Sequence, residues 1–172
     1  TTTKFWATPG TEPTVTNGAS TMTAALGGRF VKQEFATRMG SNEFKGTSYF
    51  GFNTANQQLE PFWADNLSTG MLMSTGQRQS DGSIVWTATY TDEHGQTQTA
   101  KSVTRFPAKD TIVFESYEVA STGGEFKTME VTYTRSGQVT PGGNDRVTTN
   151  FGTGTKTAPG TNTTNTTGTT TS

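Results

Sequence analysis

Between residues 18 and 135, apolar and polar side chains alternate with a period of two, in short stretches separated by turn residues. In one stretch, Ile84, Trp86, Ala88 and Tyr90 fall on one face, and the intervening positions are mostly threonine. Such alternation is typical of a strand with one buried face, and turn signals every eight to twelve residues or so are typical of an all-β sandwich or barrel. The pattern predicts about eight or nine antiparallel strands here.

Two further stretches support this interpretation. Met129, Val131 and Tyr133 share one face in the first, and Phe50 and Phe52 share one face in the second. Glycines at the breaks between stretches supply the positive φ angles that tight turns need. Threonine and the aromatic residues also favour a pleated surface. We therefore predict an all-β fold, an antiparallel up-and-down β-barrel.

Composition divides the chain into three parts: a barrel domain over 1–135, a linker with one candidate strand over 136–151, and a low-complexity tail over 152–172. The tail has eleven threonines and no large apolar side chain, so by itself it buries too little surface to offset its ordering entropy. The candidate extra strand consists of Arg146, Val147, Thr148, Thr149, Asn150 and Phe151.

Charge and cysteine content exclude several kinds of partner and site. The chain has 13 Lys+Arg against 14 Asp+Glu, a balance that predicts no nucleic-acid footprint. Its longest apolar runs are too short to span a bilayer. With no cysteine there is no disulfide, thiolate metal site or cysteine nucleophile. The chain opens Thr1-Thr2-Thr3-Lys4, without an apolar leader, so we expect either a cytosolic protein or an exported one already processed.

Four motifs, in this order and spacing, resemble the bacterial domain-of-unknown-function family 1579, over roughly residues 4–135. They are Leu26–Val31 (LGGRFV), Gly51–Asn53 (GFN), Trp63–Met71 (WADNLSTGM) and Glu125–Arg135 (EFKTMEVTYTR). The resemblance implies a lipocalin-like, calycin-type barrel and, often, export. It implies no activity, because none is established for the family.

The chain departs from that family at both ends. The family has a longer N-terminal segment before the part that matches Lys4–Gly10, so this chain begins inside the first strand. The threonine-rich extension is not part of the family pattern. We therefore expect a barrel with an incomplete first strand at one end of the chain and a spare extended segment at the other.

Catalytic patterns are scarce. The single histidine, His94, lies in a predicted turn, and we interpret it as a turn residue rather than a general base or ligand. No phosphate loop, Ser–His elbow or metal-binding spacing occurs, and no cofactor is predicted. Glu115, Glu118 and Glu130 could act as acid and base if they were desolvated inside the barrel. The favoured alternative is that they point outward and pair across the sheet with Arg105, Lys127 or Arg135.

A barrel of this size can hold one small ligand. Lining candidates are Phe50, Phe52, Trp63, Met71, Met73, Trp86, Tyr90, Met129 and Tyr133. We favour the interpretation that these residues simply fill the core. If so, no enclosed pocket of several hundred Å³ is expected.

Three asparagines, Asn66, Asn162 and Asn165, lie in glycosylation sequons. Sequons arise by chance in so threonine-rich a tail, but its hydroxyl density is typical of an O-glycosylated extracellular stalk.

We expect a non-catalytic, secreted bacterial protein, exported or on the cell surface. An incomplete barrel exposes a strand edge, and the segment 146–151 of a neighbouring copy could pair with that edge, head to tail, to build a filament. The first alternative is a monomeric carrier of a small apolar ligand. The second is a hydrolase or isomerase that uses carboxylates inside the barrel.

Overall fold

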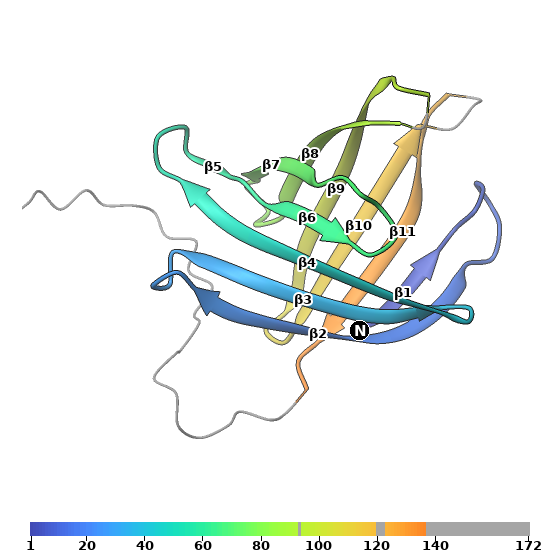
Figure 1. The fold of residues 1–172 in the computed structure, drawn as a ribbon, viewed down its shortest axis with the longest axis horizontal. Coiled ribbons are helices and arrows are strands. Elements are labelled where there is room, and N and C mark those ends of the chain that lie inside the picture. Colours follow the sequence, from blue (N-terminus) through green and yellow to red (C-terminus); the bar gives the residue numbers. More distant parts are fainter. Residues whose placement is uncertain (93, 120–122, 137–172) are drawn as a thin grey trace, which may run out of the picture.

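The computed structural model describes residues 1–92, 94–119 and 123–136, and this part of the chain is all β (Figure 1). Its strands are β1 (Thr2–Phe5), β2 (Thr14–Ala25), β3 (Phe30–Met39), β4 (Asn42–Asn53), β5 (Gln58–Leu59), β6 (Phe62–Asp65), β7 (Leu72–Arg78), β8 (Ile84–Thr91), β9 (Thr97–Ala108), β10 (Thr111–Val119) and β11 (Glu125–Thr134). The candidate strand 146–151 and the tail 152–172 lie outside the described residues.

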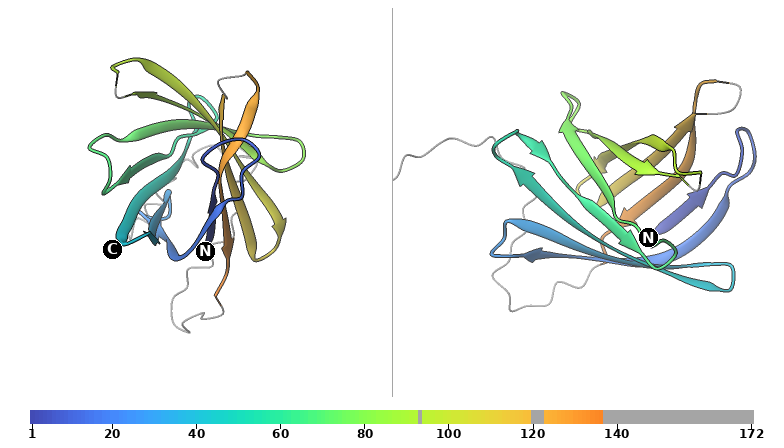
Figure 2. Two further views of the ribbon diagram at one scale, coloured as in Figure 1. Left: turned by 90° about the vertical axis from the view of Figure 1, so that its right-hand side faces the viewer. Right: turned by 45° about the horizontal axis from the view of Figure 1, so that its top comes forward.

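Each strand pairs antiparallel with its neighbours, and β1 pairs with both β2 and β11, so the sheet closes on itself. The short strands β5 and β6 share one position between β4 and β7, which gives a closed barrel of ten strand positions. Figure 2 shows these strands arranged around a common axis. The predicted antiparallel up-and-down barrel is confirmed.

The number of strands exceeds the eight or nine that the alternation predicts. One reason is Pro61, which lies between β5 and β6. A proline has no N–H to contribute to a ladder, so it interrupts a strand. Pairing nevertheless continues around it, because the Pro61 carbonyl accepts a hydrogen bond from the Ser74 amide (3.0 Å).

The centre of the barrel is packed around Trp86 on β8. Leu59 and Ile84 are buried against it, and Phe50 packs edge-on to its ring with centroids 6.1 Å apart. The indole Nε1–H donates to the Thr104 Oγ1 at 2.8 Å, so the polar end of this buried ring is satisfied. The alternation of β8 is confirmed at Ile84 and Trp86, which are 3% and 7% exposed.

One end of the barrel is plugged by aromatic rings. Phe35 lies edge-on to Phe44 and Trp63, and Phe44 stacks on Trp63, with centroids 6.0–6.2 Å apart. Gly46 makes this packing possible, since a Cβ at that position would lie 2.1 Å from the Trp63 ring. The Trp63 Nε1–H donates to Asp65 Oδ2 at 2.8 Å. We call this group of rings the aromatic plug.

The sequence after Trp63 builds the turn that follows β6. The other carboxylate oxygen of Asp65 accepts hydrogen bonds from the backbone amides of Leu67 and Ser68, each at 2.9 Å. The Asn66 side chain bridges to β4, where it donates to the Glu43 carbonyl (2.9 Å) and accepts from the Lys45 amide (2.8 Å). The motif Trp63–Met71 therefore fixes one end of the barrel.

A test of the packing uses two glycines near β7. A Cβ at Gly76 would lie 2.3 Å from the Trp86 ring, whereas nothing lies within 4 Å of the Cβ position of Gly70. Gly76→Ala should lower the free energy of unfolding by about 1–3 kcal/mol, as overpacking does. Gly70→Ala, the matched control, should change it little. Chemical denaturation of both variants measures the difference, and equal stabilities would contradict this account of the core.

Candidate functional site

Among the described residues, β2 extends beyond its pairing with β1. Strand β1 pairs with β2 only as far as Asn17 and with β11 only as far as Thr132. One residue further, the Thr1 ammonium donates to the Gly18 carbonyl at 2.9 Å, and the Gly18 amide donates to the Thr1 carbonyl at 3.0 Å. β2 then continues to Ala25 with no described strand on that side. In Figure 1 the N-terminus lies between β2 and the end of β11.

We call the space beside Ala19–Ala25 the β2–β11 gap. On its other side, β11 ends at Thr134, so the free edge of β2 is the longer wall of the gap. The opposite edge of this part of β2 pairs with β3, from Gly18↔Thr37 to Ala25↔Phe30. One edge of β2 thus retains backbone groups with no strand partner in the described chain, in the arrangement that attracts an added strand.

A cavity of about 860 Å³ lies at the same end of the barrel. Its inner wall combines apolar and polar side chains, and its rim is formed by the β7–β8 and β9–β10 turns and the end of β11. Its lining includes Thr1, Ser20, Met22, Val31, Tyr133 and Ser136. This cavity is partly open to solvent, so it does not contradict the expectation that the barrel's own aromatic residues leave no enclosed pocket. Two of the inner positions of β2 beside it, Ser20 and Ala24, carry small side chains.

Polar groups line the deep part of this cavity. The buried Gln33 amide donates to the Ser20 hydroxyl at 3.0 Å, and it also hydrogen-bonds to Tyr133. Burial raises the pKa of the Tyr133 phenol above its ordinary value of 10.0, and the Gln33 hydrogen bond only partly opposes this. The Thr1 hydroxyl is buried and has no hydrogen-bond partner among the described residues. These hydrogen-bonding groups lie beside apolar lining residues such as Val31 and Ile84.

The structure divides the predicted lining residues. Trp86 is buried, Phe50 packs on it, and Trp63 belongs to the aromatic plug. Tyr133 faces both Phe35 and the cavity. Met129 is half-buried, on the same face of β11 as the buried Val131.

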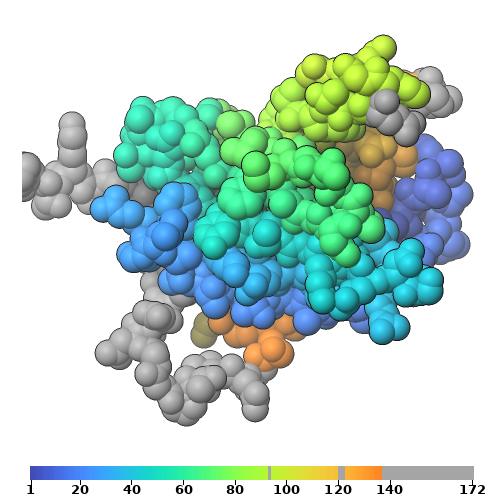
Figure 3. Space-filling model, in the orientation of Figure 1, coloured from blue at the N-terminus to red at the C-terminus, as the bar shows by residue number. Residues whose placement is uncertain are grey.

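Four predicted lining residues are largely exposed instead. Met71 and Met73 are 69% and 56% exposed, so the prediction that they line the interior is wrong. Met71 precedes β7, and Met73 lies on the face of β7 opposite Gly76, which faces Trp86. β7 and the turn before it form part of the face of the molecule seen in Figure 3. Phe52 and Tyr90 lie near strand ends and are 46% and 40% exposed.

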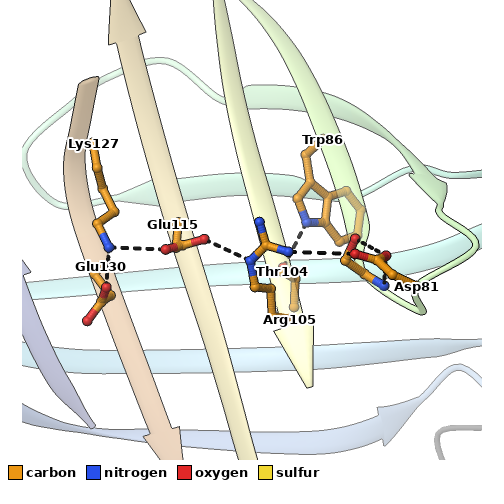
Figure 4. Close-up of polar contacts among 8 residues, drawn as sticks. Asp81, Trp86, Thr104, Arg105, Glu115, Lys127 and Glu130 are labelled. Atoms are coloured by element: carbon orange, nitrogen blue, oxygen red, sulfur yellow. Dashed lines mark hydrogen bonds and ion pairs between the residues drawn. The ribbon is translucent and has the colours of Figure 1, made fainter. Parts of the chain in front are cut away.

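The carboxylates proposed for an acid–base pair lie on the outer face of the wall (Figure 4). Glu115 binds Lys127 and Arg105, each at 3.1 Å. Glu130 binds Lys127, and it also binds Lys4 at 3.2 Å. The residues next to them in the chain, Phe114 and Val131, pair with each other and face the barrel interior.

The predicted pairing across the sheet is therefore confirmed for Glu115, which binds Lys127 of β11 and Arg105 of β9. Glu130 binds Lys127 within its own strand, and its cross-strand partner is Lys4 of β1, which the sequence did not suggest. Arg135 pairs instead with Asp110 at 2.8 Å, and Glu118 is exposed. We call Lys4, Arg105, Glu115, Lys127 and Glu130 the outer ionic network.

The outer ionic network fastens β1 to the wall. Lys4 of β1 reaches Glu130 of β11, and the Lys127 ammonium lies 5.2 Å from the centroid of the Trp6 ring, just after β1. Partial burial acts to raise the pKa of Glu115, but hydrogen bonds from Lys127 and Arg105 outweigh it and lower that pKa below 4.5. The Lys127 hydrogen bond likewise lowers the pKa of Glu130, against partial burial.

The remaining candidates lie apart from the cavity. His94 is exposed in the turn between β8 and β9, and its backbone amide donates to Asp92. Asn66 is exposed, but its amide holds the β6–β7 turn to β4. Asn162 and Asn165 lie outside the described residues.

Within the described ranges, no group of three or more His, Asp or Glu side chains could hold a metal ion. No helix in that part of the chain is long and apolar enough to cross a membrane.

Sequence reasoning missed most of the residues at the gap. Ser20, Met22 and Gln33 did not stand out, because single polar or small residues inside a strand carry no signal for a cavity.

A family model described as "Protein of unknown function (DUF1579)" matches residues 1–135. No curated protein matches the chain.

The outer ionic network predicts how stability depends on pH. Because the folded-state pKa values of Glu115 and Glu130 are depressed, their contribution is present above the unfolded value near 4.5 and is lost as pH falls below it. Glu115→Gln should therefore make the loss of stability between about pH 5 and 3 less steep. The exposed Glu118→Gln is the control. Identical pH profiles for the wild type and Glu115→Gln, in thermal unfolding, would show that this carboxylate is not stabilised by folding.

Proposed function

The chain belongs to the DUF1579 family, which carries no assigned activity, and we propose from the geometry that it is the subunit of an extracellular homopolymer joined by strand donation. In this proposal, residues 146–151 of one copy occupy the β2–β11 gap of a neighbouring copy. The single observation that carries the proposal is the free edge of β2 beside the cavity. An edge of this kind is a template for another strand.

The position of the chain's described end supports the same proposal. Ser136 lies on the cavity rim, so the segment that follows starts beside an acceptor site. Residues 137–145 can span roughly 30 Å when extended, which reaches a neighbouring barrel whose open end is close by. Each copy then has one donor and one acceptor, a heterologous arrangement that can propagate without closing.

Strand donation is favourable if ladder hydrogen bonds and side-chain burial together outweigh the cost of association. A six-residue strand makes several ladder hydrogen bonds, each contributing about 0.5–1.5 kcal/mol net. Burial of Val147 and Phe151 contributes roughly 1.5–3 kcal/mol for each side chain. Association costs translational and rotational freedom, and ordering of the segment adds to that cost. The threonine-rich remainder, 152–172, would then run along the outside of the polymer, where its hydroxyls are available to glycans.

Truncation tests the proposal. A chain that ends at Ser136 keeps every described strand, so it should remain folded but lose the polymer. A chain that ends at Gly154 keeps the donor segment and lacks most of the tail, and it should still polymerise. Electron microscopy and sedimentation velocity measure both. A truncated protein that forms the same polymer, or a full-length protein that stays monomeric at high concentration, would show the proposal to be wrong.

The cavity supports a second candidate, a carrier of a small ligand. Its volume of about 860 Å³ is within the range of ligand sites. However, part of its lining is polar, and it adjoins backbone groups of β2 with no strand partner in the described chain, which a strand satisfies better than an apolar molecule does. A fluorescent apolar probe such as N-phenyl-1-naphthylamine distinguishes the two. Saturable binding of one probe per full-length monomer would favour the carrier, and its absence in the polymer is expected here.

A further inference from the structure

The two ends of the barrel are formed by different sets of turns. The cavity end consists of the turns that join β2 to β3, β4 to β5, β7 to β8 and β9 to β10, together with the end of β11. The plug end consists of the described parts of the other turns between long strands, with the aromatic plug beside them. Each end also includes the two strand residues on either side of a turn. Figure 1 shows the β2–β3 and β4–β5 turns on the left and the β3–β4 and β6–β7 turns on the right.

The plug end is acidic. Partial burial acts to raise the pKa of Asp65, but hydrogen bonds from Trp63 and the turn amides outweigh it, so the pKa lies below 3.8. Hydrogen bonds from Gln98 and the turn amides likewise lower the pKa of Asp92. Both carboxylates therefore keep their charge at neutral pH. Within the described chain this end has six carboxylates against two cations, namely Glu12, Glu43, Asp65, Asp92, Glu118 and Glu125 against Lys4 and Arg38.

The cavity end has the opposite balance. Its described turns and strand ends carry four cations against two carboxylates, namely Arg29, Arg78, Lys109 and Arg135 against Asp81 and Asp110. The excess of positive charge lies at the mouth of the cavity, because three of the four cations line it.

The carboxylates near the cavity end are already engaged within the chain. Asp110 binds Arg135 at 2.8 Å, and Asp81 lies 3.8 Å from Arg105 of the wall. Glu60, which follows β5, accepts hydrogen bonds of 2.7–3.1 Å from the side-chain amides of two asparagines in and beside the β4–β5 turn. By contrast, Arg29 and Lys109 are exposed and have no ion-pair partner among the described residues. These two cations are available to an acidic partner.

Exposed apolar side chains also gather at the ends. Eleven large hydrophobic side chains are exposed in the described chain; nine of them belong to one end or the other, and the remaining two, Met22 and Phe106, line the cavity. The most exposed are Val119 and Met71 at the plug end, at 75% and 69%, and Leu26 at the cavity end, at 70%. A contact that covers both kinds of end would remove this apolar surface from water.

We propose that the barrel binds a second copy of itself end to end, with the basic cavity end of one copy against the acidic plug end of the next. Each end has the charge that the other end attracts, whereas two plug ends repel each other, so the charges select this orientation. The two surfaces differ, which makes the contact heterologous and able to repeat. It uses described residues alone and needs no donated strand, so it goes beyond the proposed function and can fail separately from it.

Charge reversal in the full-length protein tests the contact. Lys109→Glu changes the cavity end, and Glu118→Lys changes the plug end. Lys32→Glu and Glu34→Lys, on the β3 wall between the ends, are the matched controls with the same changes in net charge. Sedimentation velocity measures self-association at about 10 mM and about 1 M salt, where charges act over roughly 30 Å and 3 Å.

We expect association of the wild type to be stronger at low salt. Each end variant should weaken it there by roughly fivefold, and the wall variants should change it by less than about twofold. The double variant Lys109→Glu/Glu118→Lys should recover the association, because its two ends again have complementary charges.

The outcomes separate this contact from strand donation. Equal effects of the end and wall variants, or a double variant that fails to recover, would overturn the end-to-end contact. Association that neither salt nor any of these variants changes would also overturn it and leave strand donation standing. A protein that is monomeric at high salt, but associates at low salt with the expected pattern of variants, would support the contact and overturn the strand-donated polymer.

Discussion

The closure of the barrel depends on the four-residue strand β1. A closed antiparallel barrel needs two strand neighbours for each of its strands, and among the described strands only β1 joins β2 to β11. Its length sets how much of the wall is complete. Where β1 pairs, Thr3 and Val131 are buried, with only 1% and 4% of their surface exposed. Where it ends, β2 has a free edge, and a cavity replaces the core.

The two ends of the barrel differ for the same reason. At one end, Gly46 leaves room for Trp63, and the aromatic plug fills the space between the strands. At the other end, the inward positions of β2 are Ser20, Met22 and Ala24, which are too small or too exposed to fill the space. In the described part of the chain, the cavity thus lies at the end of the barrel away from the aromatic plug.

The outer ionic network explains how so short a first strand remains in place. Lys4 and Trp6 contact Glu130 and Lys127 from outside, while Thr3 packs from inside. Exposed ion pairs contribute little by themselves, but Glu115 and Glu130 have side chains only 12% and 17% exposed and share Lys127. The acidic residues that resembled a candidate acid–base pair are thus part of the structural support of β1.

The sequence by itself determined the all-β class and the inward face of β8, because a period of two is a local property of the chain. It also predicted that Glu115 and Glu130 pair across the sheet. It did not determine that Met73 faces outward, that Pro61 divides one strand position into two, or that a cavity lies beside β2. Those features depend on which strands become neighbours and in which register. Register is fixed by contacts between residues far apart in the sequence, such as Thr1 with Gly18 and Lys4 with Glu130, and only the closed tertiary structure brings these residues together.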